Sequence, residues 1–127
     1  MIVVDASAAL SGLVNDGAAR RALAAEDLHA PHLIDTEVAS GLRRRVLAND
    51  LDPAAGHAAL RVLRRLGMRR YPTTGLLERI WQLRDNLSAY DASYIALAES
   101  LDCALLTADA RLGRAPGISC PVTVVPR

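Results

Sequence analysis

The chain begins MIVVDASA (residues 1–8), and this stretch decides the fold prediction. Ile2–Val4 form an unbroken β-branched run, which is typical of a strand buried on both faces, as in a parallel sheet. Asp5 ends that run, and residues 6–14 then predict a helix that closes at Asn15-Asp16-Gly17. A buried strand that leads straight into a helix favours an α/β domain.

The remaining sequence repeats this alternation. Further strands are predicted at residues 28–31, 68–71, 103–107 and 122–125. Helices are predicted at residues 18–25, 36–48, 53–66, 74–85 and 92–100, with a short helical turn at 109–112. The length of 127 residues and the 51% hydrophobic composition predict a single domain, residues 1–127. We expect an α/β fold whose parallel sheet is covered by helices on both faces.

The basic residues exclude two classes of enzyme. All 15 basic side chains are Arg, so the chain contains no Lys. A P-loop NTPase needs a Lys on the phosphates, and Schiff-base chemistry needs a Lys amine. Because 14 acidic side chains balance the Arg residues, the net charge of +1 gives no sign of a strongly basic nucleic-acid-binding protein.

The cysteines and the apolar runs predict the compartment. Cys103 and Cys120 have neither CxxC nor metal-finger spacing, which indicates reduced thiols in a cytosol. The N-terminus has no signal-peptide pattern, and no apolar run approaches the ~20 residues of a membrane span. We therefore expect a soluble cytoplasmic protein without a membrane partner.

Four acidic residues are predicted to meet at one edge of the sheet. Asp5 and Asp109 follow predicted strands, whereas Glu37 and Asp91 lie near the starts of otherwise apolar helices. Ligands of open α/β sheets bind beyond the carboxyl ends of the strands, where the following helices also begin. Clustered carboxylates repel one another, and a hard divalent cation such as Mg²⁺ or Mn²⁺ removes that repulsion. An ion held there can activate water for phosphodiester cleavage.

Each acid also has a local structural alternative. Asp5 can cap the following helix, and Asp91 can be the acid of a capping box that begins at Ser88. Thr107 or Asp109 can cap the short turn after its strand, and Glu37 can be a partly exposed helix residue. Capping and metal binding can coexist in one carboxylate.

The other polar residues carry weaker signals. Arg43, Arg44 and Arg45 form one cluster, and a second contains Arg61, Arg64, Arg65, Arg69 and Arg70. Such clusters suit a phosphate-binding rim, an acidic-peptide dock or a solvated helix face. The three His residues lack metal-site spacing and are interpreted as structural or surface residues: His29, His32 and His57. Trp81 is interpreted as a core or interface residue.

Four blocks of the sequence resemble the PIN-domain ribonucleases, and most closely the VapC-type toxins of bacterial toxin–antitoxin pairs. The blocks are residues 1–8, 31–38, 87–99 and 105–112, in the order expected for the family. The resemblance implies a three-layer α/β/α sandwich around a short parallel sheet. It spans nearly the whole chain except residues 50–75, which match no family motif.

The resemblance also implies a site and partners. The family's acidic site falls on Asp5, Glu37, Asp91 and Asp109, with Mg²⁺ or Mn²⁺ most directly on Asp5 and Asp91. Ser7 and Thr107 would support that site. A metal-dependent endoribonuclease that cleaves cellular RNA is implied, with a cognate VapB-type antitoxin and a homodimeric assembly. A housekeeping PIN-domain nuclease and a non-catalytic PIN-like RNA-binding module are the alternatives.

Overall fold

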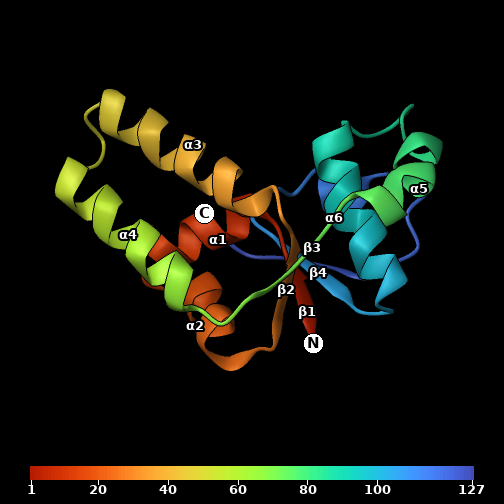
Figure 1. Ribbon diagram of the computed structural model, residues 1–127, viewed down its shortest axis with the longest axis horizontal. Helices are drawn as coiled ribbons and strands as arrows, with labels where there is room; N and C mark the ends of the chain where they lie inside the picture. Colours follow the sequence, from red (N-terminus) through yellow and green to blue (C-terminus); the bar gives the residue numbers. More distant parts are fainter.

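A computed structural model describes all residues, 1–127, as five parallel strands and six α-helices (Figure 1). The strands are β1 (Ile2–Val4), β2 (Leu28–Pro31), β3 (Arg69–Tyr71), β4 (Ala104–Thr107) and β5 (Val122–Val124). The helices are α1 (Ala6–Val14), α2 (Ala18–Ala25), α3 (Ile34–Leu47), α4 (Pro53–Arg65), α5 (Leu77–Gln82) and α6 (Ala89–Ser100). Two short 3-10 helices lie at Thr74–Leu76 and Leu112–Arg114.

The sheet order is β3-β2-β1-β4-β5, with every neighbouring pair parallel. The strand from the N-terminus is therefore central, which explains why Ile2–Val4 are continuously apolar. Val4 is in register with Leu106, and the N–H of Asp5 donates to the carbonyl of Leu106 at 3.1 Å. This register brings the ends of β1 and β4 together at one edge.

Helices cover both faces of the sheet, so the predicted three-layer α/β/α sandwich is confirmed. Helices α1 to α4 form one lobe, and α5 and α6 form the other, with the sheet between them (Figure 1). Helix α6 packs against β1, β2 and β4. Its residues 92–98 are all buried, so the middle of this helix is buried on every side.

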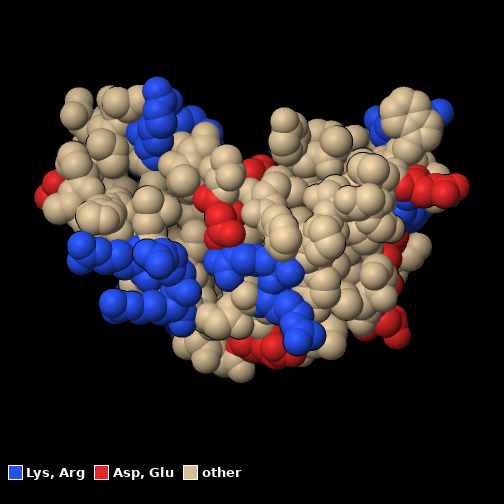
Figure 2. All heavy atoms as spheres, viewed as in Figure 1, with Lys and Arg blue, Asp and Glu red and all other residues tan.

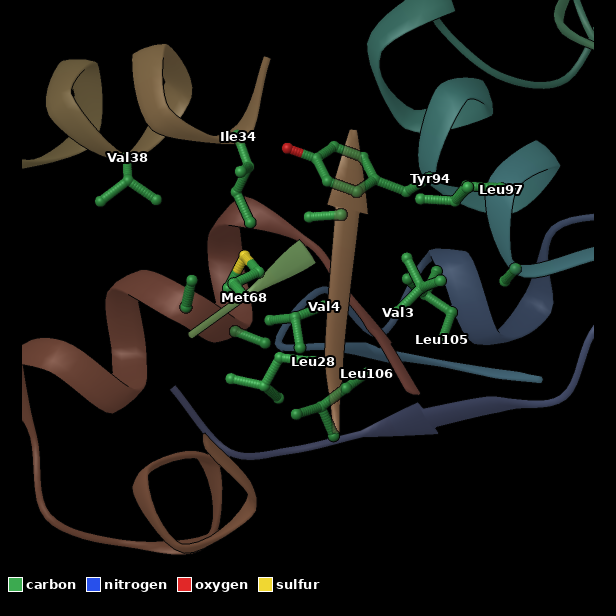
Figure 3. Close-up of a cluster of buried hydrophobic side chains, with 14 of the residues drawn as sticks. Val3, Val4, Leu28, Ile34, Val38, Met68, Tyr94, Leu97, Leu105 and Leu106 are labelled. Atoms are coloured by element: carbon green, nitrogen blue, oxygen red, sulfur yellow. The ribbon is translucent and has the colours of Figure 1, made fainter. Parts of the chain in front are cut away.

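The core extends through the sheet into both lobes (Figure 3). Val3, Val4, Leu105 and Leu106 are at most 2% exposed, and Ile34 is fully buried. Burial of such side chains contributes about 1.5–3 kcal/mol each, which holds the strand ends in place. None of the helices has the length and apolar character that crossing a bilayer requires.

Three details of the sequence interpretation are corrected. Helix α3 begins at Ile34, two residues before the predicted start, and the short turn after β4 lies at 112–114 rather than at 109–112. For Trp81 the core alternative is wrong, since the side chain is 66% exposed on α5 and the guanidinium of Arg84 lies 4.7 Å from its ring; the interface alternative stays a prediction. The core-facing side of this short helix is supplied instead by Ile80.

The histidine interpretation is confirmed for His29. This ring is 4% exposed within β2, with Nδ1 at 2.6 Å from the Tyr71 hydroxyl and Nε2 at 2.9 Å from Asp27 Oδ2. Since a carboxylate only accepts, Nε2 donates to Asp27 and the ring joins two neighbouring strands. His29 is a structural residue.

Candidate acidic active site

The four predicted acids line one cavity of about 230 Å³. Asp5 follows β1, Glu37 lies in α3, Asp91 lies in the first turn of α6, and Asp109 follows β4. Four segments that are distant in the sequence therefore contribute one acid each. The space-filling view shows acidic atoms in a hollow between the two lobes (Figure 2).

Asp5 is anchored by three hydrogen bonds. As the N-cap of α1 it accepts from the N–H of Ala8 on Oδ1 at 2.9 Å, and Ser7 Oγ donates to the same oxygen at 2.7 Å. Thr107 Oγ1 donates to Oδ2. The local capping alternative is thus correct, yet Oδ2 accepts only one hydrogen bond and so keeps a free lone pair, and Asp5 also lines the cavity.

The supporting hydroxyls Ser7 and Thr107 are oriented by the backbone that follows β4. Ser7 Oγ accepts from the N–H of Ala108 at 2.8 Å, and Thr107 Oγ1 accepts from the N–H of Asp109 at 3.0 Å. Because both oxygens accept from the backbone, both protons are free to point at Asp5. This arrangement couples the end of β4 to the position of the Asp5 carboxylate.

Glu37 is held by a residue that the sequence interpretation missed. Tyr94 is 2% exposed, and its hydroxyl donates to Glu37 Oε1 at 2.6 Å. Figure 3 shows this hydroxyl pointing from α6 toward α3. The signal was present in the sequence, since Tyr94 lies three residues after Asp91 and therefore on the same helix face. The bond spans the sheet edge between the two lobes.

Asp91 is the N3 residue of α6, and its N–H donates to Ser88 Oγ at 3.1 Å. The Ser88 half of the predicted capping box is therefore confirmed. Asp91 is only half-buried and lies at the positive end of the helix dipole, where a carboxylate is favoured.

Asp109 differs from the other acids because it already has a cationic partner. Arg111 Nη2 lies 2.6 Å from Asp109 Oδ2, and Arg111 Nε donates to both carboxylate oxygens. The guanidinium is 79% exposed, whereas the carboxylate is 16% exposed. The acid faces the cavity while its partner lies in solvent.

Burial and mutual repulsion shift the acids' pKa values. Burial raises the pKa of Asp5, which hydrogen bonds from Thr107 and Ser7 partly offset. The pKa values of Glu37 and Asp91 are also raised, first by burial and then by neighbouring carboxylates of the cluster. The Arg111 guanidinium lowers the pKa of Asp109. The cavity therefore holds three carboxylates that gain from an added positive charge.

Three arginines also line the cavity: Arg44, Arg45 and Arg127. Arg44 and Arg45 lie seven and eight residues after Glu37, two helical turns along the same face of α3, so the spacing carried a signal. No sequence pattern indicated Arg127, because this residue reaches the site through tertiary contacts. Val125 N–H donates to the carbonyl of Thr107 at 2.8 Å, and Arg127 Nε donates to that of Ala108 at 3.3 Å. The second Arg cluster does not line this cavity.

The donor set fits a hard divalent cation. All the candidate ligands are carboxylate or hydroxyl oxygens, the type that Mg²⁺ and Mn²⁺ prefer. No three His, Cys, Asp or Glu side chains lie close enough together to form a preformed metal cage. Mg²⁺ does not need one, since it is usually bound by one or two carboxylates and retains several waters.

Comparison with known proteins identifies the family of this chain. The PIN-domain family model matches residues 2–118. The chain is 62% identical over 127 residues to ribonuclease VapC9 of Mycobacterium tuberculosis, covering 100% of both chains. It is 45% identical over 128 residues to ribonuclease VapC1 of the same species, covering 97% of this chain and 96% of the relative.

A solved structure extends the comparison to the fold. The crystal structure of Mycobacterium tuberculosis VapC20, described as a sarcin-ricin loop cleaving toxin, superimposes with a TM-score of 0.70. The match covers 94% of this chain and 97% of that chain at 21% identity. The chain belongs to the PIN-domain family and, within it, to the VapC ribonucleases.

Proposed function

We propose that the protein is a metal-dependent endoribonuclease that acts as the toxin of a toxin–antitoxin pair and hydrolyses phosphodiester bonds in cellular RNA. One observation carries the proposal: Asp5, Glu37, Asp91 and Asp109 line a single cavity in a chain with 62% identity to a VapC ribonuclease. The cavity is open on one side, as a polymeric substrate requires.

In this proposal Asp5 and Asp91 bind Mg²⁺ or Mn²⁺, and Asp109 and Glu37 complete the site. The ion supplies Lewis-acid stabilisation of the charge that develops on the phosphodiester oxygens. Ser7 and Thr107 fix the orientation of the Asp5 carboxylate through the contacts that tie it to β4.

Glu37 and the arginines have separate roles. Glu37, held at Oε1 by Tyr94, positions the attacking water with its second oxygen. Arg44 and Arg45 contact substrate phosphates from the α3 side of the cavity. Guanidinium groups suit that role because their planar fork matches two phosphate oxygens.

Single Asp5→Asn and Asp91→Asn variants test the mechanism. Asn preserves the shape of each side chain, and at position 5 its oxygen still accepts from the N–H of Ala8. We expect each variant to lose about 100-fold or more in RNA cleavage with Mg²⁺ or Mn²⁺, and to stop arresting growth on expression. Asp50→Asn, an exposed acid outside the cavity, is the matched control. Wild-type cleavage by either site variant would refute the mechanism.

The proposal includes the partners that the family resemblance implies. We propose a cognate VapB-type antitoxin, a homodimer and a cytoplasmic location. Co-expression with the neighbouring antitoxin gene should restore growth, and light scattering should give twice the 13.6 kDa mass of one chain. Growth arrest that no neighbouring gene relieves would favour a housekeeping nuclease.

A further inference from the structure

A second cavity, of about 530 Å³, adjoins the acidic one. Asp91 lines both cavities, so they are neighbours across a single side chain. Two segments form the walls of the second cavity: residues 86–88, which lead into α6, and residues 111–116, which follow β4. A polymer that reaches the acids therefore has an adjoining space for its next unit.

The lining of this second cavity combines apolar, polar and cationic groups. The half-buried Leu87 and Ala115 supply apolar surface, and the exposed Asn86 supplies an amide. Arg114 is exposed at this lining, and no hydrogen bond or salt bridge holds its guanidinium. Arg111 adds a second guanidinium, fixed in orientation by Asp109.

An ion pair fixes the segment that continues from the 111–116 wall of the second cavity. Arg79 Nε lies 2.7 Å from Glu99 Oε1, joining α5 to α6. Arg79 Nη2 also donates to the carbonyl of Gly117 at 2.8 Å, and Glu99 Oε2 accepts from the N–H of Ser119 at 2.6 Å. Gly117 has φ of +82°, a conformation that side-chain-bearing residues rarely adopt. The irregular segment after residue 114 is thus fixed at both a carbonyl and an amide.

We propose that the second cavity is a subsite for the nucleotide next to the scissile phosphate, in an unpaired stretch of RNA. Unpaired bases are bound by stacking on apolar side chains and guanidinium planes, with polar groups reading the base edge. Leu87 and Ala115 provide the stacking surface, Asn86 reads the base, and Arg114 binds the adjacent phosphate. This inference rests on the proposed ribonuclease function.

An acidic peptide fits the cavity less well than a nucleotide. A peptide carboxylate would lie beside Asp91, which repels it. An RNA strand whose scissile phosphate is held in the acidic cavity by Arg44 and Arg45 places its next nucleotide in the adjoining cavity. The Arg114 guanidinium could bind a carboxylate as well as a phosphate, but the apolar lining beside it matches the flat face of a base.

Binding measurements test the subsite without requiring catalysis. The probe is a fluorescein-labelled single-stranded RNA ten-mer of random sequence, bound to the Asp5→Asn protein over a range of salt concentrations. Adding Arg114→Gln should weaken binding and reduce the slope of log K against log salt by about 0.7, the value for one lost contact on a single strand. Arg61→Gln removes the same charge from an exposed position outside both cavities and should change neither.

Equal behaviour of the Arg114 and Arg61 variants would overturn the subsite, as would tighter binding of a poly-glutamate peptide than of the RNA. Mapping of RNA cleavage sites gives an independent readout, in protein that retains Asp5. Asn86→Ala should flatten the base preference at one position on one side of the cut, and a preference that stays unchanged would also overturn the subsite. Absence of RNA cleavage by the wild-type enzyme would instead refute the proposed function. The two failures can be told apart because the binding assay does not require cleavage.

Discussion

Asp5 illustrates how a single carboxylate can meet a structural and a chemical requirement together. Oδ1 is used by the first turn of α1 and by Ser7, whereas Oδ2 accepts from Thr107. Burial raises its pKa, because it destabilises the ionised carboxylate, and the three hydrogen bonds only partly offset this effect. A helix cap alone does not require a buried carboxylate, since an exposed one caps equally well. Its burial follows from its position at the end of the central strand β1, where Ser7 and Thr107 contact the carboxylate.

Tyr94 acts on Glu37 rather than on the substrate, and this makes a prediction at the residue scale. Tyr94→Phe removes only the hydroxyl that donates to Glu37 Oε1, leaving the carboxylate free to rotate away from the cavity. Loss of a positioning partner of this kind costs about 10- to 100-fold in activity. We expect the loss in kcat, with little change in KM, measured on an RNA oligonucleotide.

The matched control for Tyr94 is Tyr71→Phe. It also removes a hydroxyl from a hydrogen bond, here the one with His29 Nδ1, but outside the acidic cavity. This variant should keep wild-type kcat even though its stability falls. If the two variants lost activity equally, the Tyr94 hydroxyl would have only a general structural role.

At the scale of elements, short-range patterns predicted the structure well wherever the cause was local. The β-branched run at Ile2–Val4 and the cap at Ser88 each act within a few residues. That the four acids would lie around one cavity was predictable because strand ends and helix starts share one edge of a parallel sheet. Tertiary contacts could not be predicted from such patterns. Arg127 reaches the cavity only because the C-terminal segment pairs with Thr107.

The Arg79–Glu99 ion pair was equally invisible in the sequence, because its partners lie 20 residues apart on different helices. It gives the prediction for this scale. Arg79 lowers the pKa of Glu99, so the ionised acid stabilises the fold. That contribution is present above the unfolded-state pKa of about 4.3 and is lost as the pH falls through the lower folded-state pKa.

Glu99→Gln should therefore lower Tm by a few degrees at pH 7, and the difference from wild type should shrink toward zero as the pH is lowered below about 4. Thermal unfolding followed by circular dichroism at several pH values measures it. Glu78→Gln, an exposed acid in α5 without a salt bridge, should give no such difference. A Glu99 effect that stays constant with pH would show that shape, not charge, is what the position needs.

For the whole molecule, the near-zero net charge conceals an uneven distribution of charge. Four of the 14 acids line the cavity between the lobes, whereas arginines project from α3 and α4 (Figure 2). The acids come from β1, α3, α6 and the segment after β4, so their repulsion acts across both lobes. A site of this kind destabilises the metal-free fold, and a bound cation reverses the effect.

Repulsion among the cavity carboxylates leads to a prediction on the stability of the metal-free protein. The raised pKa of Asp91 means that its ionised form opposes folding: the penalty is absent below the unfolded-state pKa of about 3.9 and grows as the pH rises through the folded-state pKa. Metal-free Asp91→Asn should therefore have a higher Tm than metal-free wild type at pH 7, and the two should converge in acid. Asp50→Asn, exposed and outside the cavity, should match wild type throughout.

Adding Mn²⁺ or Mg²⁺ should reverse the order of the two proteins. A ligand that binds only the folded state at 100 times its Kd stabilises by about 2.7 kcal/mol, so the Tm of wild type should rise with metal concentration. Asp91→Asn should respond far less, because it lacks one of the two proposed ligands. Calorimetric scans with and without metal give both results from one preparation. A wild-type Tm that does not change with either ion at millimolar concentration would contradict the metal site. A metal-free Asp91→Asn variant that is less stable than wild type would mean that capping of α6 outweighs carboxylate repulsion at Asp91.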